Sequence, residues 1–233
     1  MDVIELNIPD DVRNYQVTNG ICPELKKKSE EYYALAVLKY CDKLRFLSLH
    51  KAESPDLQDD NGILGIEVTN AESPRDQQIN GESIKYRHAK TEEEQEKSLR
   101  IILRNGGDRN AYCTTYPTGT DTKELKNIQN AYCKKLKKLN MYREKCTEVG
   151  LVIRIDVPIC ILGDAQWGNL LHKENEDGFD FVALLHWSGM DIYEMKTGKY
   201  SLFKIEREDM DNLKKLGRMA AEGKIKDDDP VWQ

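Results

Sequence analysis

The chain has 233 residues, of which 33% are charged and 39% are hydrophobic, and its formal net charge is −6 at pH 7. This length suits one domain with embellishments and is enough to bury a real core. The mild excess of acid argues against a protein whose whole surface binds nucleic acid, although a local basic groove is compatible with it. No apolar run approaches the length that a bilayer requires, and the first residues do not resemble a signal peptide. We therefore predict a cytoplasmic protein without a membrane segment.

The six cysteines are scattered and include no Cys-x-x-Cys pair. Zinc-finger spacing is therefore absent, and a disulfide framework is not expected in a chain of this length without export signals. We interpret the cysteines as reduced thiols, several of which fill the core.

The first element that the sequence predicts is a helix that begins near Lys26, after an irregular lead-in over residues 1–25. Its apolar residues recur with a period near 3.6; they are Ala34, Leu35, Val37, Leu38 and Cys41. Residues 44–49 are then predicted to form a short strand that ends at His50 and Lys51.

A β-hairpin follows, with one strand over residues 53–57, a tight turn over 58–62 and a second strand over 63–69. The turn contains Asp-Asp-Asn-Gly, and asparagine and glycine tolerate the positive φ that tight turns require. Glu67 is the one acid in the otherwise apolar second strand, and Asp56 lies across the hairpin from it. We expect the two carboxylates to approach each other at the open end, where they either hold a divalent cation or repel each other.

Pro55-Asp56, the hairpin and Ile66-Glu67-Val68-Thr69 together resemble the PD-(D/E)XK restriction-endonuclease-like superfamily, with Thr69 where the lysine of the motif would stand. The resemblance covers residues 28–71, and the remainder of the chain only by the order of its elements. It implies that Asp56, Glu67 and the carbonyl group of Val68 bind Mg²⁺, with Mn²⁺ as a possible substitute. In the superfamily the lysine assists the attacking water, and Thr69 can form hydrogen bonds but carries no charge.

The same resemblance implies an acidic residue on the helix before the core sheet, and Glu31 is the better candidate because it shares a face with two core leucines. Glu30 is close behind, and the alternative is that both acids only complement the helix dipole. Glu53 is a further candidate ligand, since three carboxylates make a more natural metal site than two. Lys51 is near Asp56 in sequence and would supply a positive charge that Thr69 lacks, unless it is simply a solvated lysine at a strand end.

Beyond the hairpin, residues 73–121 are predicted to form an insertion that contains a helix near 91–103. The longest predicted helix spans residues 122–145 and carries many lysines, which either are solvated or contact a nucleic-acid backbone. Lys135 borders the apolar stripe of this helix. Because members of the superfamily relocate the catalytic lysine to a neighbouring helix, Lys135 is the candidate substitute.

The remaining chain is predicted to contain four strands, a helix and a charged tail, over residues 150–157, 179–187, 190–195, 200–205, 210–222 and 225–233. With the earlier elements this indicates a single α/β domain over residues 1–233. Its expected centre is a restriction-endonuclease-like αβββαβ core with a mixed sheet flanked by helices and extra C-terminal strands. The expected parts are the core over about 26–71 and 122–205, the insertion over about 73–121, and the C-terminal helix and tail over 208–233.

The sequence leaves three functions open. The first is Mg²⁺-dependent hydrolysis of phosphodiester bonds in DNA or RNA. The second is a binding or scaffolding protein that keeps the nuclease-like fold without cleavage, because the motif lysine is absent. The third is an ordinary α/β domain whose carboxylates are surface residues, since a fold does not determine a function.

Overall fold

The structure is a computed structural model that describes residues 9–15, 22–72, 74–107, 120–155, 168, 171 and 177–232. The chain divides into two compact units. The first unit joins residues 1–70 to residues 128–233, and the second comprises residues 71–127. The predicted insertion falls inside the second unit, and the predicted site residues all belong to the first.

The first unit is built on a seven-stranded sheet in which the strands follow their order along the chain. The strands are β1 (His50–Lys51), β2 (Leu57–Gln58), β3 (Leu64–Asn70), β4 (Glu148–Arg154), β5 (Phe181–His186), β6 (Gly189–Glu194) and β7 (Tyr200–Lys204). The pairs β3–β4 and β4–β5 are parallel, and the other pairs are antiparallel. The predicted α/β class, with a mixed sheet flanked by helices, is therefore confirmed.

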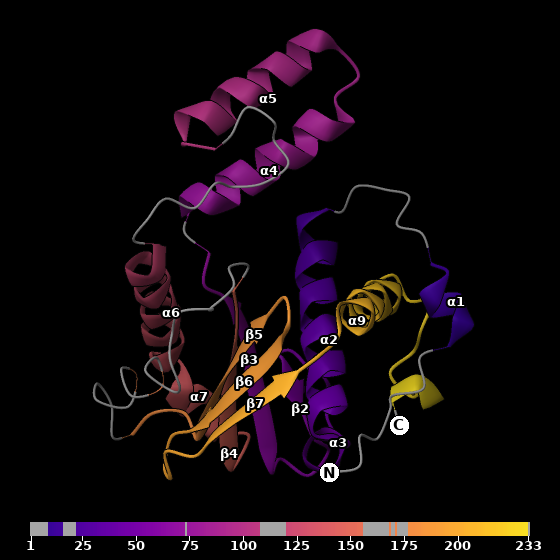
Figure 1. Ribbon diagram of the computed structural model, residues 1–233. Coiled ribbons are helices and arrows are strands. Elements are labelled where there is room, and N and C mark those ends of the chain that lie inside the picture. Colours follow the sequence, from indigo (N-terminus) through magenta and orange to yellow (C-terminus); the bar gives the residue numbers. More distant parts are fainter. Residues whose placement is uncertain are drawn as a thin grey trace. The chain divides into compact units, whose positions relative to one another are not determined.

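Helices α2 (Pro23–Cys41) and α9 (Arg207–Ala221) pack together against one face of the sheet (Figure 1). The apolar stripe of α2 joins the same buried cluster as Ile66 and Val68 of β3. The two helices approach closely at Gly217, where a Cβ atom would lie 2.6 Å from the backbone nitrogen of Tyr33. Because successive side chains of a strand alternate between faces, Glu67 lies on the face opposite to this cluster.

The opposite face is covered by α7 (Leu139–Arg143) and the C-terminal half of α6 (Thr120–Leu136). The prediction of one helix over residues 122–145 is wrong, because the chain turns at residues 137–138 between these two helices. The apolar spacing continues through the turn and so conceals it. The turn buries Leu139 and Tyr142 and presents α7 to β4.

The predicted strand over residues 44–49 is also wrong. The structure has a short helix, α3 (Lys43–Phe46), at whose start the side chain of Asp42 accepts a hydrogen bond from the backbone N–H of Arg45 at 3.2 Å. Leu44 is 86% exposed and therefore does not belong to any core face. The aspartate cap explains the difference, since it favours a helical turn over an extended chain.

The ends of the chain differ from the predictions as well. The lead-in contains a short helix, α1 (Asp10–Arg13), and α2 begins at Pro23 rather than near Lys26. The predicted charged tail ends in a 3₁₀-helix, η1 (Pro230–Trp232), that is part of the core. The indole of Trp232 is buried and stacks on the ring of Tyr32 with 5.9 Å between the ring centroids.

The second unit contains two packed helices, α4 (Pro74–His88) and α5 (Glu92–Arg104). The predicted helix over 91–103 corresponds to α5 and is confirmed. Its N-cap is Thr91, whose hydroxyl accepts a hydrogen bond from the N–H of Glu94 at 3.2 Å. The sequence did not predict α4, because that helix contributes few apolar side chains to the small core around Ile79 and Ile102.

The later predictions agree with the structure apart from their bounds. The predicted strand over 150–157 begins earlier, as β4, and its last two residues lie outside the described part of the chain. The three following strands correspond to β5, β6 and β7, and the last predicted helix corresponds to α9. Within the part of the chain that the structure describes, no helix has both the length and the apolar character needed to traverse a bilayer.

The turn between β2 and β3 is closed by the side chain of Asp59. One oxygen of this buried carboxylate accepts hydrogen bonds from the N–H groups of Ile63 at 2.8 Å and Leu64 at 3.1 Å. Gly62 has a φ of +66°, which is the left-handed conformation expected of the Asn-Gly pair. The hairpin register pairs Leu57 with Ile66.

We expect Asp59→Ala to lower the free energy of unfolding by about 1 kcal/mol, because two backbone donors lose their acceptor at a buried turn. Chemical denaturation measures the change. Asp60→Ala is the matched control, since this neighbouring side chain is 88% exposed and its ion pair with His50 spans 3.7 Å. Equal effects of the two substitutions would contradict this account of the turn.

Candidate active site

Asp56 and Glu67 come together where the hairpin opens. Asp56 directly precedes β2, and its Oδ2 atom accepts a hydrogen bond from the N–H of Val68 at 2.9 Å. This bond fixes the carboxylate of Asp56 beside the residue that follows Glu67. The two acids are 4% and 5% exposed respectively, and they are close enough for the charge of Glu67 to act on the ionisation of Asp56. The Ser54–Pro55 peptide bond that leads into this turn is cis.

Helix α2 brings a third carboxylate, Glu31, which is 4% exposed. Its Oε2 atom forms an ion pair with Lys51 at the end of β1, with 2.7 Å between the oxygen and Nζ. Its Oε1 atom is fully buried and makes no hydrogen bond. The ammonium group of Lys27, one turn earlier on α2, lies 3.2 Å from Oε1 of Glu31 and 3.7 Å from Oδ1 of Asp56.

Glu67 is held by side chains of α6 and α7, which cover the face of the sheet opposite to α2. The ammonium group of Lys135, near the C-terminal end of α6, forms an ion pair and a hydrogen bond with Oε1 of Glu67. The hydroxyl of Tyr142 on α7 hydrogen-bonds to the same carboxylate. Glu67 is therefore oriented by two groups that lie far from it in sequence, and one of them is a lysine.

Burial and neighbouring charges perturb the ionisation of Asp56, Tyr142 and Lys27. Burial, followed by the charge of Glu67, raises the pKa of Asp56 to about 6, and the hydrogen bond from Val68 opposes the shift. Burial and the nearby Glu67 also raise the pKa of Tyr142. For Lys27 partial burial acts to lower the pKa, but the charges of Glu31 and Asp56 outweigh it, so the pKa is raised. A buried carboxylate with a raised pKa beside other acids is typical of functional sites.

The ion pairs form two groups, one of Glu31, Asp56, Lys27 and Lys51 and the other of Glu67 and Lys135. The two groups adjoin closely enough for the charge of Glu67 to act on Asp56 and Lys27, and we call the six side chains together the acid–lysine cluster. When all six side chains are ionised, their formal charges balance. Burying carboxylates together is unfavourable unless such counter-charges are present. A cavity of about 540 Å³ opens beside the α2 side of the cluster and is lined by Lys28, Ala52 and Glu53 as well as by several cluster residues.

The remaining sequence candidates occupy different places. Glu53 is exposed on the wall of this cavity and is not buried with the other carboxylates. Thr69 is half-buried on the same face of β3 as Glu67. Glu30, the second helix candidate, forms an ion pair with Arg154 at 2.9 Å and accepts a hydrogen bond from Asn70 at 3.2 Å. Of the two acids on α2, Glu31 is therefore the one that joins Asp56.

The donor set suits a hard divalent cation, because it consists of carboxylate oxygens together with the carbonyl group of Val68. In the described residues no three His, Cys, Asp or Glu side chains already stand in positions that would hold a metal ion. The carboxylates are engaged with ammonium groups instead. The buried Oε1 atom of Glu31 and the Oδ1 atom of Asp56 both face the ammonium group of Lys27, at 3.2 and 3.7 Å. The donor chemistry therefore fits Mg²⁺ or Mn²⁺ once an ammonium group moves away.

Sequence reasoning missed two members of this site. Lys27 precedes Glu31 by four residues on α2, a spacing that brings side chains together on one helix face and was a usable signal. Tyr142 continued the apolar spacing of the predicted helix over 122–145 and therefore resembled an ordinary core residue. Only the turn between α6 and α7 directs its hydroxyl to Glu67.

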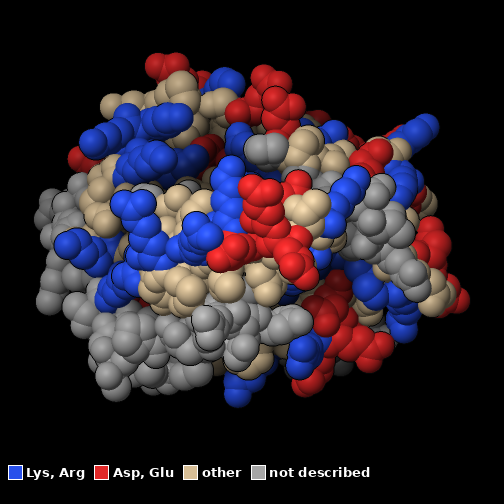
Figure 2. All heavy atoms as spheres, turned by 90° about the horizontal axis from the view of Figure 1, so that it is seen from above, with Lys and Arg blue, Asp and Glu red and all other residues tan. Residues whose placement is uncertain are grey.

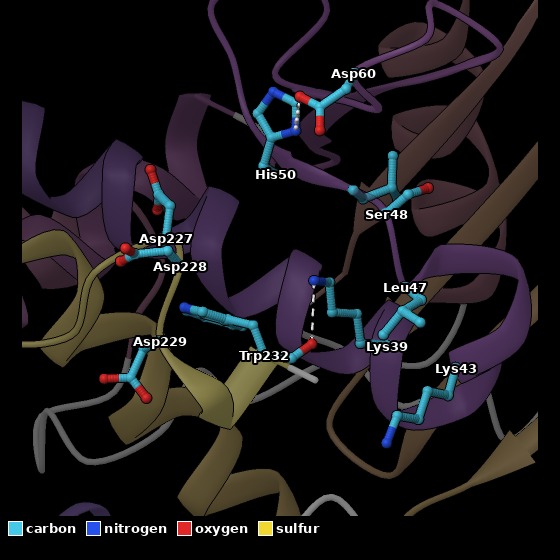
Figure 3. A pocket seen from close by; sticks show the side chains of 11 residues that line it. Lys39, Lys43, Leu47, Ser48, His50, Asp60, Asp227, Asp228, Asp229 and Trp232 are labelled. Carbon is cyan, nitrogen blue, oxygen red and sulfur yellow. Dashed lines mark hydrogen bonds and ion pairs between the residues drawn. The ribbon is translucent and has the colours of Figure 1, made fainter.

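A second cavity, of about 720 Å³, lies elsewhere in the first unit (Figure 3). Asp227, Asp228 and Asp229 line one side of it. Lys39 points into its interior and donates a hydrogen bond to the carbonyl oxygen of Trp232 at 3.2 Å. Burial lowers the pKa of Lys39 to about 8. This cavity is larger, but it does not bring buried carboxylates together, so the acid–lysine cluster remains the better candidate for catalysis.

The surface offers a less specific signal. Figure 2 shows Lys and Arg side chains interspersed with Asp and Glu side chains over the coloured part of the face that it presents. Among the exposed basic residues of the first unit are Lys134, Lys137 and Lys138, which follow or flank the position of Lys135. Mixed charge of this kind does not by itself define a path for a phosphate backbone.

Comparisons of the chain with protein-family models, with curated proteins and with solved structures give no match.

Proposed function

We propose that this protein hydrolyses phosphodiester bonds of nucleic acid with the help of a divalent cation, at the acid–lysine cluster of a restriction-endonuclease-like core. The observation that carries the proposal is the contact of Lys135 with Glu67, since it brings an ammonium group to the paired carboxylates. The order of α2, the strands β1 to β3, the helices α6 and α7, and the parallel strand β4 supports the proposed core.

Each residue of the cluster has a role in this proposal. Asp56, Glu67 and the carbonyl group of Val68 would hold Mg²⁺, with Glu31 as a further ligand. When bound, the cation would polarise the scissile phosphate and lower the pKa of the attacking water. Lys135 would orient that water and stabilise the negative charge that develops on the phosphoryl oxygens, which is the usual task of a buried cationic donor.

Neighbouring side chains and a backbone N–H group position the three carboxylates. Tyr142 fixes the carboxylate of Glu67 through its hydroxyl, and the N–H of Val68 fixes that of Asp56. Lys51 holds one oxygen of Glu31 and leaves the other available. Because these supports come from rigid strands and helices, the carboxylates need little rearrangement before reaction.

The second candidate is a nuclease-like binding or scaffolding protein without cleavage. It is favoured by the balance of three ammonium groups against three carboxylates, since these charges compensate each other without a bound metal ion. A cation-free cluster would keep the fold and could still contact phosphates through its lysines.

An endonuclease assay tests the proposal. Protein freed of metal with EDTA is incubated with labelled single-stranded DNA, duplex DNA and RNA, with Mg²⁺, with Mn²⁺ or without metal. We expect cleavage of at least one substrate only when metal is present, and its loss in Glu67→Gln, which keeps the size of the side chain but removes the charge. Glu53→Gln is the matched control, because this glutamate is exposed beside the same cavity.

The outcomes separate the candidates. A wild-type protein that binds nucleic acid but cleaves nothing in either metal supports the binding function and rejects the enzyme. A protein that neither binds nor cleaves any of the three substrates rejects both functions. Cleavage that persists in Glu67→Gln would show that the activity does not belong to this cluster.

A further inference from the structure

The position of one ammonium group in the acid–lysine cluster is unusual. The Nζ atom of Lys27 lies between two carboxylates on different elements, 3.2 Å from Oε1 of Glu31 and 3.7 Å from Oδ1 of Asp56. The charge of Glu67 acts on the same ammonium group. One monovalent cation therefore sits where the fields of three buried carboxylates converge.

The oxygens that face Lys27 are those that the rest of the protein leaves available. In Glu31 the other oxygen, Oε2, is taken by Lys51, while Oε1 is buried and makes no hydrogen bond. In Asp56 the other oxygen, Oδ2, accepts the hydrogen bond from Val68. The backbone and Lys51 thus orient one oxygen of each acid toward a shared position, and the ammonium group of Lys27 lies at that position.

The three lysines of the cluster differ in how firmly they are held. The side chains of Lys51 and Lys135 are 17% and 16% exposed, whereas that of Lys27 is 72% exposed. Ion pairs of exposed lysines contribute little net stability, about 0 to 1 kcal/mol, because the flexible chain loses entropy and water competes for the ammonium group. Lys27 is therefore the counter-ion that can leave without disturbing the buried part of the cluster.

We propose that Lys27 occupies the cation position of this cluster, and that a divalent cation binds by displacing its ammonium group. Lys27 then determines the metal affinity of the site, because each binding event must break its contacts with Glu31 and Asp56. The inference rests on the proposed function only in so far as both require a divalent cation here. It concerns metal binding in the absence of nucleic acid, and it adds a residue that the motif resemblance does not include.

The displaced side chain keeps a role at the site. Lys27 lines the cavity of about 540 Å³ together with Lys28 and Lys51, so its ammonium group remains at the mouth after it leaves the carboxylates. A phosphate group that enters this cavity would meet a lysine just released from its ion pairs. The same side chain can thus neutralise the acids before the metal binds and the phosphate afterwards.

The test measures Mn²⁺ and Mg²⁺ binding to EDTA-treated protein by isothermal titration calorimetry, at low ionic strength and without nucleic acid. The variant is Lys27→Met, which keeps the aliphatic stem and removes the charge. We expect it to bind Mn²⁺ about tenfold more tightly than the wild type, since its metal does not compete with an internal cation. We also expect its Tm without metal to be lower than that of the wild type, and its increase in Tm on adding metal to be larger.

Lys26→Met is the matched control. Lys26 also pairs with a glutamate four residues later on α2, Glu30, at 3.8 Å, but it does not contact Asp56. The Lys26→Met variant should therefore bind Mn²⁺ with the affinity of the wild type. Equal or weaker metal binding by Lys27→Met than by the wild type would overturn the displacement proposal while the proposed function stands. Absence of metal binding in the wild type and in Lys27→Met alike would overturn both.

Discussion

Replacing Lys135 with alanine is expected to lower the rate of metal-dependent cleavage by about 100- to 1000-fold, the usual effect of removing one hydrogen-bond donor from a transition state. The ammonium group of Lys135 contacts Glu67 directly and is the positive charge that Thr69 does not provide. Single-turnover cleavage of the best substrate measures the effect. Affinity for Mn²⁺ should change much less than the rate, because Lys135 is not one of the proposed ligands.

Lys134→Ala provides the control for this experiment. Lys134 is the preceding residue of α6 and its side chain is exposed, so it shares the helix but not the contact with Glu67. Its removal should leave the rate of bond cleavage unchanged and at most weaken nucleic-acid binding at low salt. A Lys135→Ala variant that cleaves at the wild-type rate would show that Lys135 is not the catalytic charge and would point to Lys51 in its place.

The second large effect concerns stability. We expect Asp56→Asn to raise the free energy of unfolding by about 2 kcal/mol near pH 7.5, because the wild-type protein must bury this carboxylate in ionised form beside Glu67. Burial and the charge of Glu67 raise the pKa of Asp56 from its ordinary 3.8 to about 6. Asparagine resembles the protonated acid and keeps an oxygen that can accept the hydrogen bond from Val68.

The direction of the pH dependence follows from this shift. An acid whose pKa is higher in the folded protein than in the unfolded chain binds its proton more tightly when folded. The contribution of Asp56 to stability is therefore fully present below pH 3.8 and is lost as the pH rises through about 6. The free energy of unfolding of Asp56→Asn should accordingly equal that of the wild type below pH 3.8. The difference between the two should reach its full value above about pH 6.

Urea denaturation at a series of pH values, without metal, measures how the free energy of unfolding depends on pH in the wild type and in Asp56→Asn. Adding Mg²⁺ should stabilise the wild type, because a ligand that binds only the folded state raises its stability, and should have little effect on the variant. Asp60→Asn, at a highly exposed position of the same hairpin, should match the wild type at every pH. A stability loss for Asp56→Asn at neutral pH would show that the ion pair with Lys27 outweighs the effect of burial.

Some elements of this molecule could be recognised from local chemistry alone. The Asn-Gly turn and the alternation in β3 predict the hairpin, and the register places Asp56 near Glu67 as expected. The period of 3.6 in α2 and the β-branched run of β4 are equally local signals. Each depends on residues within about ten positions of each other, so neighbouring side chains suffice to define it.

Other elements could not be recognised in this way. The apolar run before His50 has the composition of a strand, but a capping aspartate makes part of it α3 and leaves Leu44 in water. The charged C-terminal stretch contains Trp232, which is buried where the ring of Tyr32 on α2 stacks on its indole and where the carbonyl of Lys226 accepts a hydrogen bond from its N–H. In both cases a contact outweighs a preference read from the chain.

The α/β class, the hairpin with its two acids, and Lys51 and Lys135 as candidate positive charges follow from the amino-acid sequence, because they depend on local spacing and composition. Which lysines contact the acids depends on the packing of distant elements, and this packing adds Lys27 to the set. Lys135 reaches Glu67 because α6 packs across the sheet from α2, and Lys27 reaches Asp56 because Val68 and Lys51 hold the other carboxylate oxygens away. Charges separated by many residues are brought together only by packing, and no local pattern records the result.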